Sequence, residues 1–338
     1  MHHKLDDTND HYLHLALKMC LSALKDPSLE EQTSTFLFGA SGIHALLSVI
    51  YSELGEELLA KEHANKVIEE CDVVESLDCY ELLFGYAGII SSLLFLLENV
   101  PKQFYNVERV LQIVNNHCES IMKDGKVHYK MPNGKHYYGA AHGLAGILFT
   151  LMHNTHIIKD SKYRGAIESS LNELITKQAD GLFRSLPNAW DSISPKVHWC
   201  HGSPGTIPAL VKAHALFNNP EYLKIAELAT EKVWECGILW KGLNLCHGVC
   251  GNAYSFVCMY NYTQNHKYLY YAYQFCLLAN DPEIQCKFIS YFDPQRKQLG
   301  TSDHPLSLFE GIAGEGCFYL DLLHPRGSQF PGYGWNSI

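Results

Sequence analysis

The fold of this chain is decided by a stretch that reads Gly85-Tyr-Ala-Gly-Ile-Ile-Ser-Ser-Leu-Leu-Phe-Leu-Leu97. Two glycines three residues apart precede a run that is apolar on most sides, and a helix that is apolar all round is a buried helix. A glycine pair at such a start removes Cβ atoms where loop and helix backbones approach closely, and it also permits turns with positive φ. The stretch therefore predicts a buried helix that is entered through a tight glycine turn.

The same glycine element occurs six times along the chain. Successive first glycines are 46 to 63 residues apart, which leaves room for two helices and their connections in each repeat. The segments between the elements are amphipathic, as in Glu221 to Trp234, and are predicted to form an outer layer of helices. The elements are Gly39-Ala-Ser-Gly42, Gly85-Tyr-Ala-Gly88, Gly143-Leu-Ala-Gly146, Gly202-Ser-Pro-Gly205, Gly248-Val-Cys-Gly251 and Gly311-Ile-Ala-Gly314.

These repeats predict an all-α protein. Strand signals are weak, and at most one hairpin is expected, near residues 125–129. Alternating inner and outer helices can close as an α/α toroid or extend as an open solenoid, and the unequal spacings favour the closed form. The chain is 47% hydrophobic, which suffices for a large core. We therefore predict one α/α-toroid domain, a double-layered ring of helical hairpins, over residues 1–338.

Composition and charge exclude several classes of partner. The formal net charge of −10 argues against a general attraction to nucleic acid or to an anionic membrane, so an anionic ligand needs a local basic cluster.

The first residues have no apolar core of signal-peptide length, and no later run reaches about 18 apolar residues. A cytoplasmic location is expected, while peripheral membrane association and a nuclear location stay open. The 12 cysteines are spread over a long chain and are interpreted as mostly reduced core residues.

Two of the six elements carry a Cys-His pair directly before the first glycine, in Trp199-Cys-His-Gly202 and Leu245-Cys-His-Gly248. Equivalent repeat positions would place these side chains side by side at one mouth of the predicted ring. Zinc prefers thiolate and imidazole ligands, and a helix N-terminus stabilises a thiolate. A single Cys-His pair is better explained as a small buried cysteine and a histidine that hydrogen-bonds to a loop. The duplication favours a zinc site, although the spacing is not that of a zinc finger.

Four blocks of the sequence carry a resemblance that runs, in the same order, from about Phe36 to about Leu323 and covers most of the chain. They resemble the characteristic blocks of eukaryotic LanC-like proteins, which are relatives of bacterial lanthionine cyclases. This resemblance implies a toroid of seven helical hairpins, of which one lacks a clear glycine element here. The blocks are Tyr138-Gly-Ala-Ala-His-Gly-Leu-Ala-Gly146, Val197-His-Trp-Cys-His-Gly-Ser-Pro-Gly205, Leu245-Cys-His-Gly-Val-Cys-Gly-Asn-Ala-Tyr254 and Leu308-Phe-Glu-Gly-Ile-Ala-Gly314.

The resemblance also implies a ligand set of Cys200, Cys246 and His247 for one zinc ion, with His201 a neighbour rather than a ligand. Three protein ligands leave a tetrahedral zinc with one open position, as in catalytic sites. A substrate thiol that fills this position is deprotonated at neutral pH without a strong protein base.

Three further residues receive roles from the resemblance. His142 matches the histidine that protonates the carbanion formed when sulfur adds to a dehydrated residue. Glu81 matches an acidic residue that assists catalysis in bacterial cyclases. Lys241 matches a lysine that contacts glutathione. The residues alone allow other readings: a loop hydrogen bond for His142, a solvated or helix-capping carboxylate for Glu81, and an ordinary surface lysine for Lys241.

The leading hypothesis is an enzyme that adds the thiol of glutathione to dehydroalanine or dehydrobutyrine in damaged proteins or peptides, with or without prior elimination of phosphate from phosphoserine or phosphothreonine. The alternative is a non-catalytic module that binds glutathione or a signalling partner and retains zinc. This alternative is favoured by Gly300, which stands where the family has a basic residue, with Arg296 and Lys297 nearby. A lanthionine cyclase with its own precursor peptide is a third reading. A toroid glycosidase or terpenoid cyclase ranks low, because the chain shows no convincing carboxylate pair.

Overall fold

The computed structural model describes residues 11–31, 34–72, 77–187, 196–239, 241–283 and 304–334. Helices form nearly all of the regular structure in these residues, and one short hairpin forms the rest. The predicted all-α class is therefore confirmed. No helix among the described residues is long and apolar enough to span a membrane.

The chain divides into two compact units, of which the first comprises residues 1–134, 150–168 and 335–338 and the second residues 135–149 and 169–334. The single domain over residues 1–338 stays a prediction. The residues of α6 (Leu144–Leu151) and α8 (Ser161–Ile175) are divided between the two units.

The first unit is built on two glycine-led helices, α2 (Ala40–Glu53) and α4 (Tyr86–Asn99). These helices pack against each other, and α4 is buried on nearly every side from Tyr86 to Leu97, as its sequence predicts. The amphipathic α3 (Glu57–Asp72) packs on α2, and α5 (Val107–Ile121) packs on α4. The unit also holds α1 (His11–Ala23), α7 (Thr155–Lys159), and the 3-10 helices η1 (Pro27–Glu31), η2 (Lys102–Phe104) and η3 (Lys123–Gly125).

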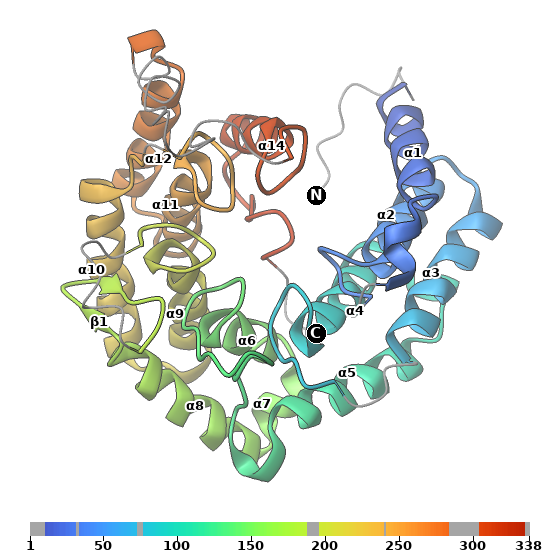
Figure 1. Ribbon diagram of the computed structural model, residues 1–338, viewed down its shortest axis with the longest axis horizontal. Coiled ribbons are helices and arrows are strands. Elements are labelled where there is room, and N and C mark those ends of the chain that lie inside the picture. Colours follow the sequence, from blue (N-terminus) through green and yellow to red (C-terminus); the bar gives the residue numbers. More distant parts are fainter. Residues whose placement is uncertain are drawn as a thin grey trace. The chain divides into compact units, whose positions relative to one another are not determined.

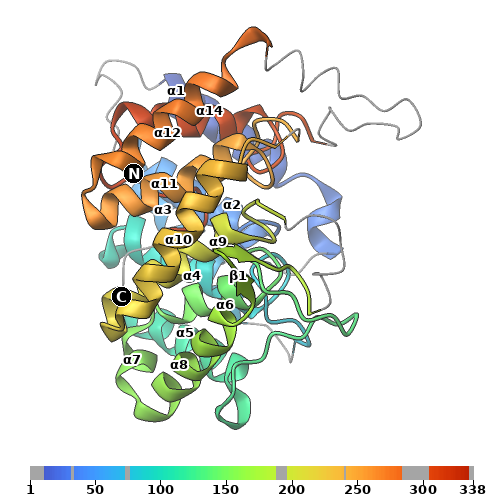
Figure 2. The same cartoon turned by 90° about the vertical axis from the view of Figure 1, so that its left-hand side faces the viewer.

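The second unit repeats this arrangement. Its glycine-led helices are α9 (Ser203–Phe217), α11 (Val249–Thr263) and α14 (Ile312–Leu323), and α11 packs against both of the others. The amphipathic α10 (Pro220–Cys236) packs on α9, and α12 (His266–Ala279) packs on α11. Figure 1 and Figure 2 both show α9, α10 and α11 side by side. The segment from Glu221 to Trp234, predicted as an amphipathic helix, lies within α10.

The one described hairpin pairs β1 (Gln178–Ala179) with β2 (Leu182–Phe183) in antiparallel register. It is turned by Asp180 and Gly181, whose φ angles of 50° and 78° suit a two-residue hairpin turn. Residues 125–129, where at most a hairpin is expected, begin in η3 and form no strand, and the nearest bridge residues are Lys130 and His136.

The glycine elements start each buried helix by allowing the backbone to fold tightly on itself. A Cβ atom on the second glycine of every element would overlap the carbonyl oxygen six residues earlier. Where the first glycine is the N-cap, its φ lies between −104° and −146°, which any residue can adopt. Positive φ is therefore not what the glycines provide at these starts. Close approach is the reason for them, and it presses each preceding loop against the first turn of its helix.

Candidate metal centre

Two neighbouring loops of the second unit carry the Cys-His pairs. Cys200 precedes α9 and Cys246 precedes α11, and the two loops are adjacent because α9 and α11 pack together. The Cys200 N–H donates to the Cys246 carbonyl oxygen at 3.2 Å, and the Cys246 N–H donates to the Phe309 carbonyl oxygen at 2.7 Å. On the other side, the Ala141 N–H donates to the Cys200 carbonyl oxygen at 3.3 Å. Backbone hydrogen bonds thus join the loops before α6, α9, α11 and α14 in series.

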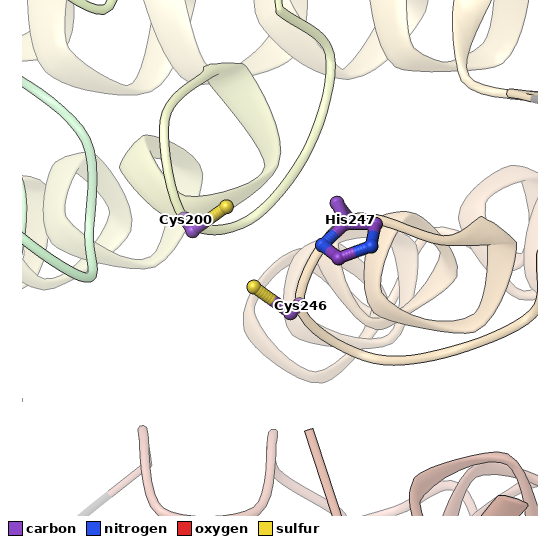
Figure 3. Close-up of side chains that lie close together, drawn as sticks. All are labelled: Cys200, Cys246 and His247. Carbon is purple, nitrogen blue, oxygen red and sulfur yellow. The ribbon is translucent and has the colours of Figure 1, made fainter. Parts of the chain in front are cut away.

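The side chains of Cys200, Cys246 and His247 converge. Their ligand atoms all lie within 4.8 Å of one another, and Figure 3 shows the two sulfur atoms and the imidazole pointing toward one another from the two loops. Among the described residues this is the one group of three or more side chains that could hold a metal ion. Two sulfurs and one imidazole are the donor set that zinc prefers.

The electrostatics of the two cysteines also suit a cation. The side-chain hydrogen bond with Cys200, followed by burial, raises the pKa of the Cys246 thiol. Two adjacent thiolates, one at the buried Cys200 and one at the half-buried Cys246, would repel each other, so Cys246 holds its proton strongly. A divalent cation reverses this balance, because a coordinating thiol is deprotonated outright. The residues present therefore fit a metal ion with thiolate ligands.

The chain matches the model of the lanthionine synthetase C-like protein family over residues 2–334. It belongs to this family. The glutathione S-transferase LANCL1 of Danio rerio is 34% identical to it over 320 residues, which cover 90% of this chain and 75% of that protein. The solved structure of nisin cyclase superimposes with a TM-score of 0.63 at 19% identity, covering 92% of this chain and 81% of that one. The likeness to nisin cyclase confirms the predicted fold class, the α/α toroid of LanC-like proteins.

A residue of this LanC-like protein that the sequence analysis missed lies next to the ligands. The Nδ1 atom of His198 is 3.1 Å from Cys200 Sγ, and the side chain is 3% exposed. Burial, followed by the positive charge of Lys241, lowers the pKa of His198 to about 2. The sequence signal was present, since His198 stands in the quoted block two residues before Cys200, but the turn that joins them could not be inferred from it.

His142 belongs to a cluster of three rings beside the Cys200 loop. The ring centroid of His201 lies 5.5 Å from that of His142 and 5.3 Å from that of Tyr137, and the Tyr137 and His142 centroids are 5.9 Å apart. Burial, then the positive charge of Lys196, lowers the pKa of His201 to about 3. His201 is not among the three convergent ligands. His142 is half-buried, and its ring is next to that of His201, the residue that follows Cys200.

Lys241 is held close to the ligands of this LanC-like protein through Asn244. The Asn244 side chain donates from Nδ2 to the Lys241 carbonyl oxygen and accepts from the His247 N–H, both at 3.0 Å. The Lys241 side chain is exposed, as is that of Lys196, which the sequence analysis did not single out. The positive charges of both lysines lower the pKa of His198 and of His201. The centre is therefore flanked by positive charge.

Glu81 belongs to the first unit and holds the loop before α4. Its buried carboxylate accepts from the Leu83 N–H at 3.0 Å and from the Phe84 N–H at 2.6 Å. These contacts are those of a structural carboxylate at a helix start, which was the alternative reading of this residue. Its catalytic role stays a prediction. Gly300, Arg296 and Lys297 lie outside the described residues.

An aromatic cluster packs around Trp199, the residue before Cys200. The Trp199 ring stacks on Phe330 with centroids 4.9 Å apart, and it meets Phe309 at 5.0 Å and Tyr333 at 5.5 Å. The Tyr333 hydroxyl donates to the Gly205 carbonyl oxygen at 3.0 Å. Phe330 and Tyr333 therefore anchor the Cys200 loop and the first turn of α9. The position of Cys200 depends on both.

Proposed function

We propose that this protein binds one zinc ion through Cys200, Cys246 and His247 and activates the thiol of glutathione for addition to dehydroalanine or dehydrobutyrine in proteins or peptides. The observation that carries the proposal is the convergence of two sulfurs and one imidazole within 4.8 Å. The similarity to a protein named glutathione S-transferase and to nisin cyclase supports a reaction in which a thiol forms a thioether.

Three protein ligands leave one position of a tetrahedral ion for the substrate. A thiol bound there is available as a nucleophile at neutral pH, which is the chemistry that zinc supplies when bound. The other requirements fall on the chain itself: it must bind an anionic tripeptide, hold the acceptor, and give a proton to the acceptor carbon.

His142 is the proton donor in this proposal. When sulfur bonds to the β-carbon of dehydroalanine, the electrons of the carbon-carbon double bond move to the α-carbon, which must then take a proton. An imidazole can donate it. The position of His142 in the ring cluster next to the Cys200 loop supports this role. If the acceptor arises from phosphoserine or phosphothreonine, the same side chain removes the α-proton as phosphate leaves the β-carbon.

The ammonium groups of Lys241 and Lys196 would bind the negatively charged groups of the substrates. Both ammonium groups are exposed, and neither forms an ion pair with a described residue. Their positive charge lowers the pKa of His198 and of His201, which stand on either side of Cys200 in the same loop. A carboxylate of glutathione or a phosphate on the acceptor suits such point charges.

The test uses zinc-loaded protein, glutathione and a peptide with one dehydroalanine, with the adduct followed by mass spectrometry. We expect adduct from the wild type, none from Cys200→Ala, and much less from His142→Ala with glutathione binding kept. The exposed His156, changed to alanine, is the matched control and should leave the rate unchanged. A phosphoserine peptide, assayed for released phosphate, tests the elimination step.

The non-catalytic alternative predicts a different outcome. Gly300 stands where the family carries a basic residue, and this loss favours binding without turnover. In that case glutathione binds equally to the wild type and His142→Ala, and neither forms adduct even with one zinc ion per chain.

A further inference from the structure

His198 contacts the metal-binding group without belonging to it. Its Nδ1 atom lies 3.1 Å from Cys200 Sγ, while the convergent ligand atoms are those of Cys200, Cys246 and His247. A turn holds the two residues together, since the N–H groups of His201 and Gly202 donate to the His198 carbonyl oxygen at 3.3 and 2.8 Å. The contact is therefore fixed by the backbone of the loop that presents the ligand.

The surroundings of the His198 ring leave Cys200 as its hydrogen-bond partner. The side chain is 3% exposed, and its buried Nε2 atom has no hydrogen-bond partner among the described residues. The rings of His201 and His247 stand edge-on to it, with centroids 5.8 and 6.2 Å away. In its neutral form the ring carries one N–H, on either Nδ1 or Nε2.

Which nitrogen carries that hydrogen depends on the state of Cys200. A Cys200 thiol can donate its hydrogen to Nδ1, but a thiolate can only accept. Cysteines that bind metal are thiolates. When the site holds a metal ion, the 3.1 Å contact can therefore be a hydrogen bond only if Nδ1 carries the hydrogen and donates it to sulfur.

We propose that His198 is a positioning residue of the metal centre, whose Nδ1–H donates a hydrogen bond to the Cys200 thiolate. This inference rests on the zinc site of the proposed function. The bond orients Sγ toward the other ligands, and it stabilises the thiolate form in which sulfur binds a metal ion. It also withdraws electron density from the Cys200 sulfur, which keeps this ligand less nucleophilic than the substrate thiol.

Three substitutions separate hydrogen bonding from packing. Asparagine places its Nδ2–H₂ donor near the position of the imidazole Nδ1, glutamine places its donor farther out, near Nε2, and leucine has none. We expect the zinc dissociation constant of His198→Leu and His198→Gln to rise about 10- to 100-fold, the usual effect of losing an outer partner of a metal ligand. His198→Asn should stay within about threefold of the wild type because it retains the donor.

A second readout reports on the sulfur itself. In cobalt-substituted protein, a hydrogen bond lowers the energy of the thiolate lone pairs and raises the energy of the sulfur-to-cobalt charge-transfer band. The band should move to lower energy in His198→Leu and His198→Gln, and should keep the wild-type position in His198→Asn. A role limited to filling space would not produce this pattern.

The control is His214→Leu, at the far end of α9, where Nδ1 lies 2.5 Å from the Tyr262 hydroxyl oxygen. It loses a comparable hydrogen bond and should leave the zinc affinity and the cobalt spectrum unchanged. Equal losses in the asparagine and glutamine variants, or wild-type behaviour in leucine, would overturn the proposal. If the leucine variant does not fold, the asparagine and glutamine pair decides. Neither readout needs turnover, so a protein that binds zinc but forms no glutathione adduct refutes the proposed function and leaves this test standing.

Discussion

The amide of Cys200 donates its hydrogen to the carbonyl oxygen of Cys246 at 3.2 Å, so two predicted ligands of one metal ion are joined through their backbones. This bond makes no use of either sulfur. The loops that carry the ligands are therefore held in register by main-chain groups. A metal ion that binds only to the folded state of such a site adds stability.

Removal of the metal should leave the helices intact. We expect a strong chelator to strip zinc from the purified protein with no loss of helical circular dichroism, together with a lower midpoint of thermal unfolding, because an ion bound only to the folded state stabilises it. Collapse of the helical signal on chelation would show instead that the metal organises the fold.

Zinc content should depend on Cys200 and Cys246 but not on every buried cysteine. Elemental analysis should find one zinc per wild-type chain and almost none in Cys200→Ala or Cys246→Ala, because two remaining ligands bind the ion weakly. Cys250 is the matched control, since it is fully buried at the start of α11, four residues after Cys246. Cys250→Ala should keep its zinc, and a loss there would assign the ion to another site.

Close approach at the glycine elements predicts opposite effects for two glycine-to-alanine changes. At Gly251 a Cβ atom would overlap the Leu245 carbonyl oxygen, so Gly251→Ala should lower the free energy of unfolding by about 2 kcal/mol or more. Because this loop carries Cys246, zinc affinity should fall too. Gly316, within α14, has nothing within 4 Å of its Cβ position, and Gly316→Ala should stabilise by about 0.5–1 kcal/mol. Urea denaturation measures the free energy of unfolding of both variants, and an equal change in the two would refute the packing argument.

A pair of histidines in the first unit should make stability depend on pH. Nδ1 of His44 lies 2.9 Å from Nδ1 of His63, and burial lowers the pKa of each from 6.5 to about 4. Between pH 4 and 6.5 the unfolded chain therefore binds more protons than the folded one, so stability falls as the pH drops through this window. We expect stability to fall steadily between pH 7 and pH 5 and to level off below pH 4.

Substitution identifies the source of that pH dependence. His63→Gln should flatten the stability profile between pH 7 and pH 5 in denaturation experiments at each pH, because one of the two depressed groups is gone. His156→Gln removes an exposed histidine in the same unit and should leave the slope as it is. Equal slopes in all three proteins would assign the effect to other groups.

Much of the fold could be read from the sequence because its signals are local. Each glycine element directly precedes an apolar helix, and the reason is a contact within the same few residues, such as Gly251 with the Leu245 carbonyl. Most of these helices are buried as predicted, but only four of the residues of α14 are buried. The proximity of the two Cys-His pairs could also be predicted, since equivalent positions in adjacent repeats must lie close together. The choice of His247 over the equivalent His201 came from the family resemblance alone. What could not be predicted depends on particular turns. The contact between His198 and Cys200 requires the tight turn that follows His198.

The same limit applies elsewhere in the chain. The hydrogen bonds that Glu81 accepts depend on how the loop before α4 folds. The residue type alone could therefore not distinguish a structural carboxylate from a catalytic one. The hairpin at Asp180 and Gly181 is too short to produce alternation that a sequence pattern can reveal.

The serial backbone bonds between the loops have a consequence for how this scaffold can change over time. Ala141, Cys200, Cys246 and Phe309 are linked through groups that every residue except proline possesses. Side chains at these loops can therefore be exchanged without undoing the attachments that position them. Such a framework can acquire a new reactive group, or lose one, through single substitutions, and diversification of chemistry on it does not require the surrounding architecture to be rebuilt.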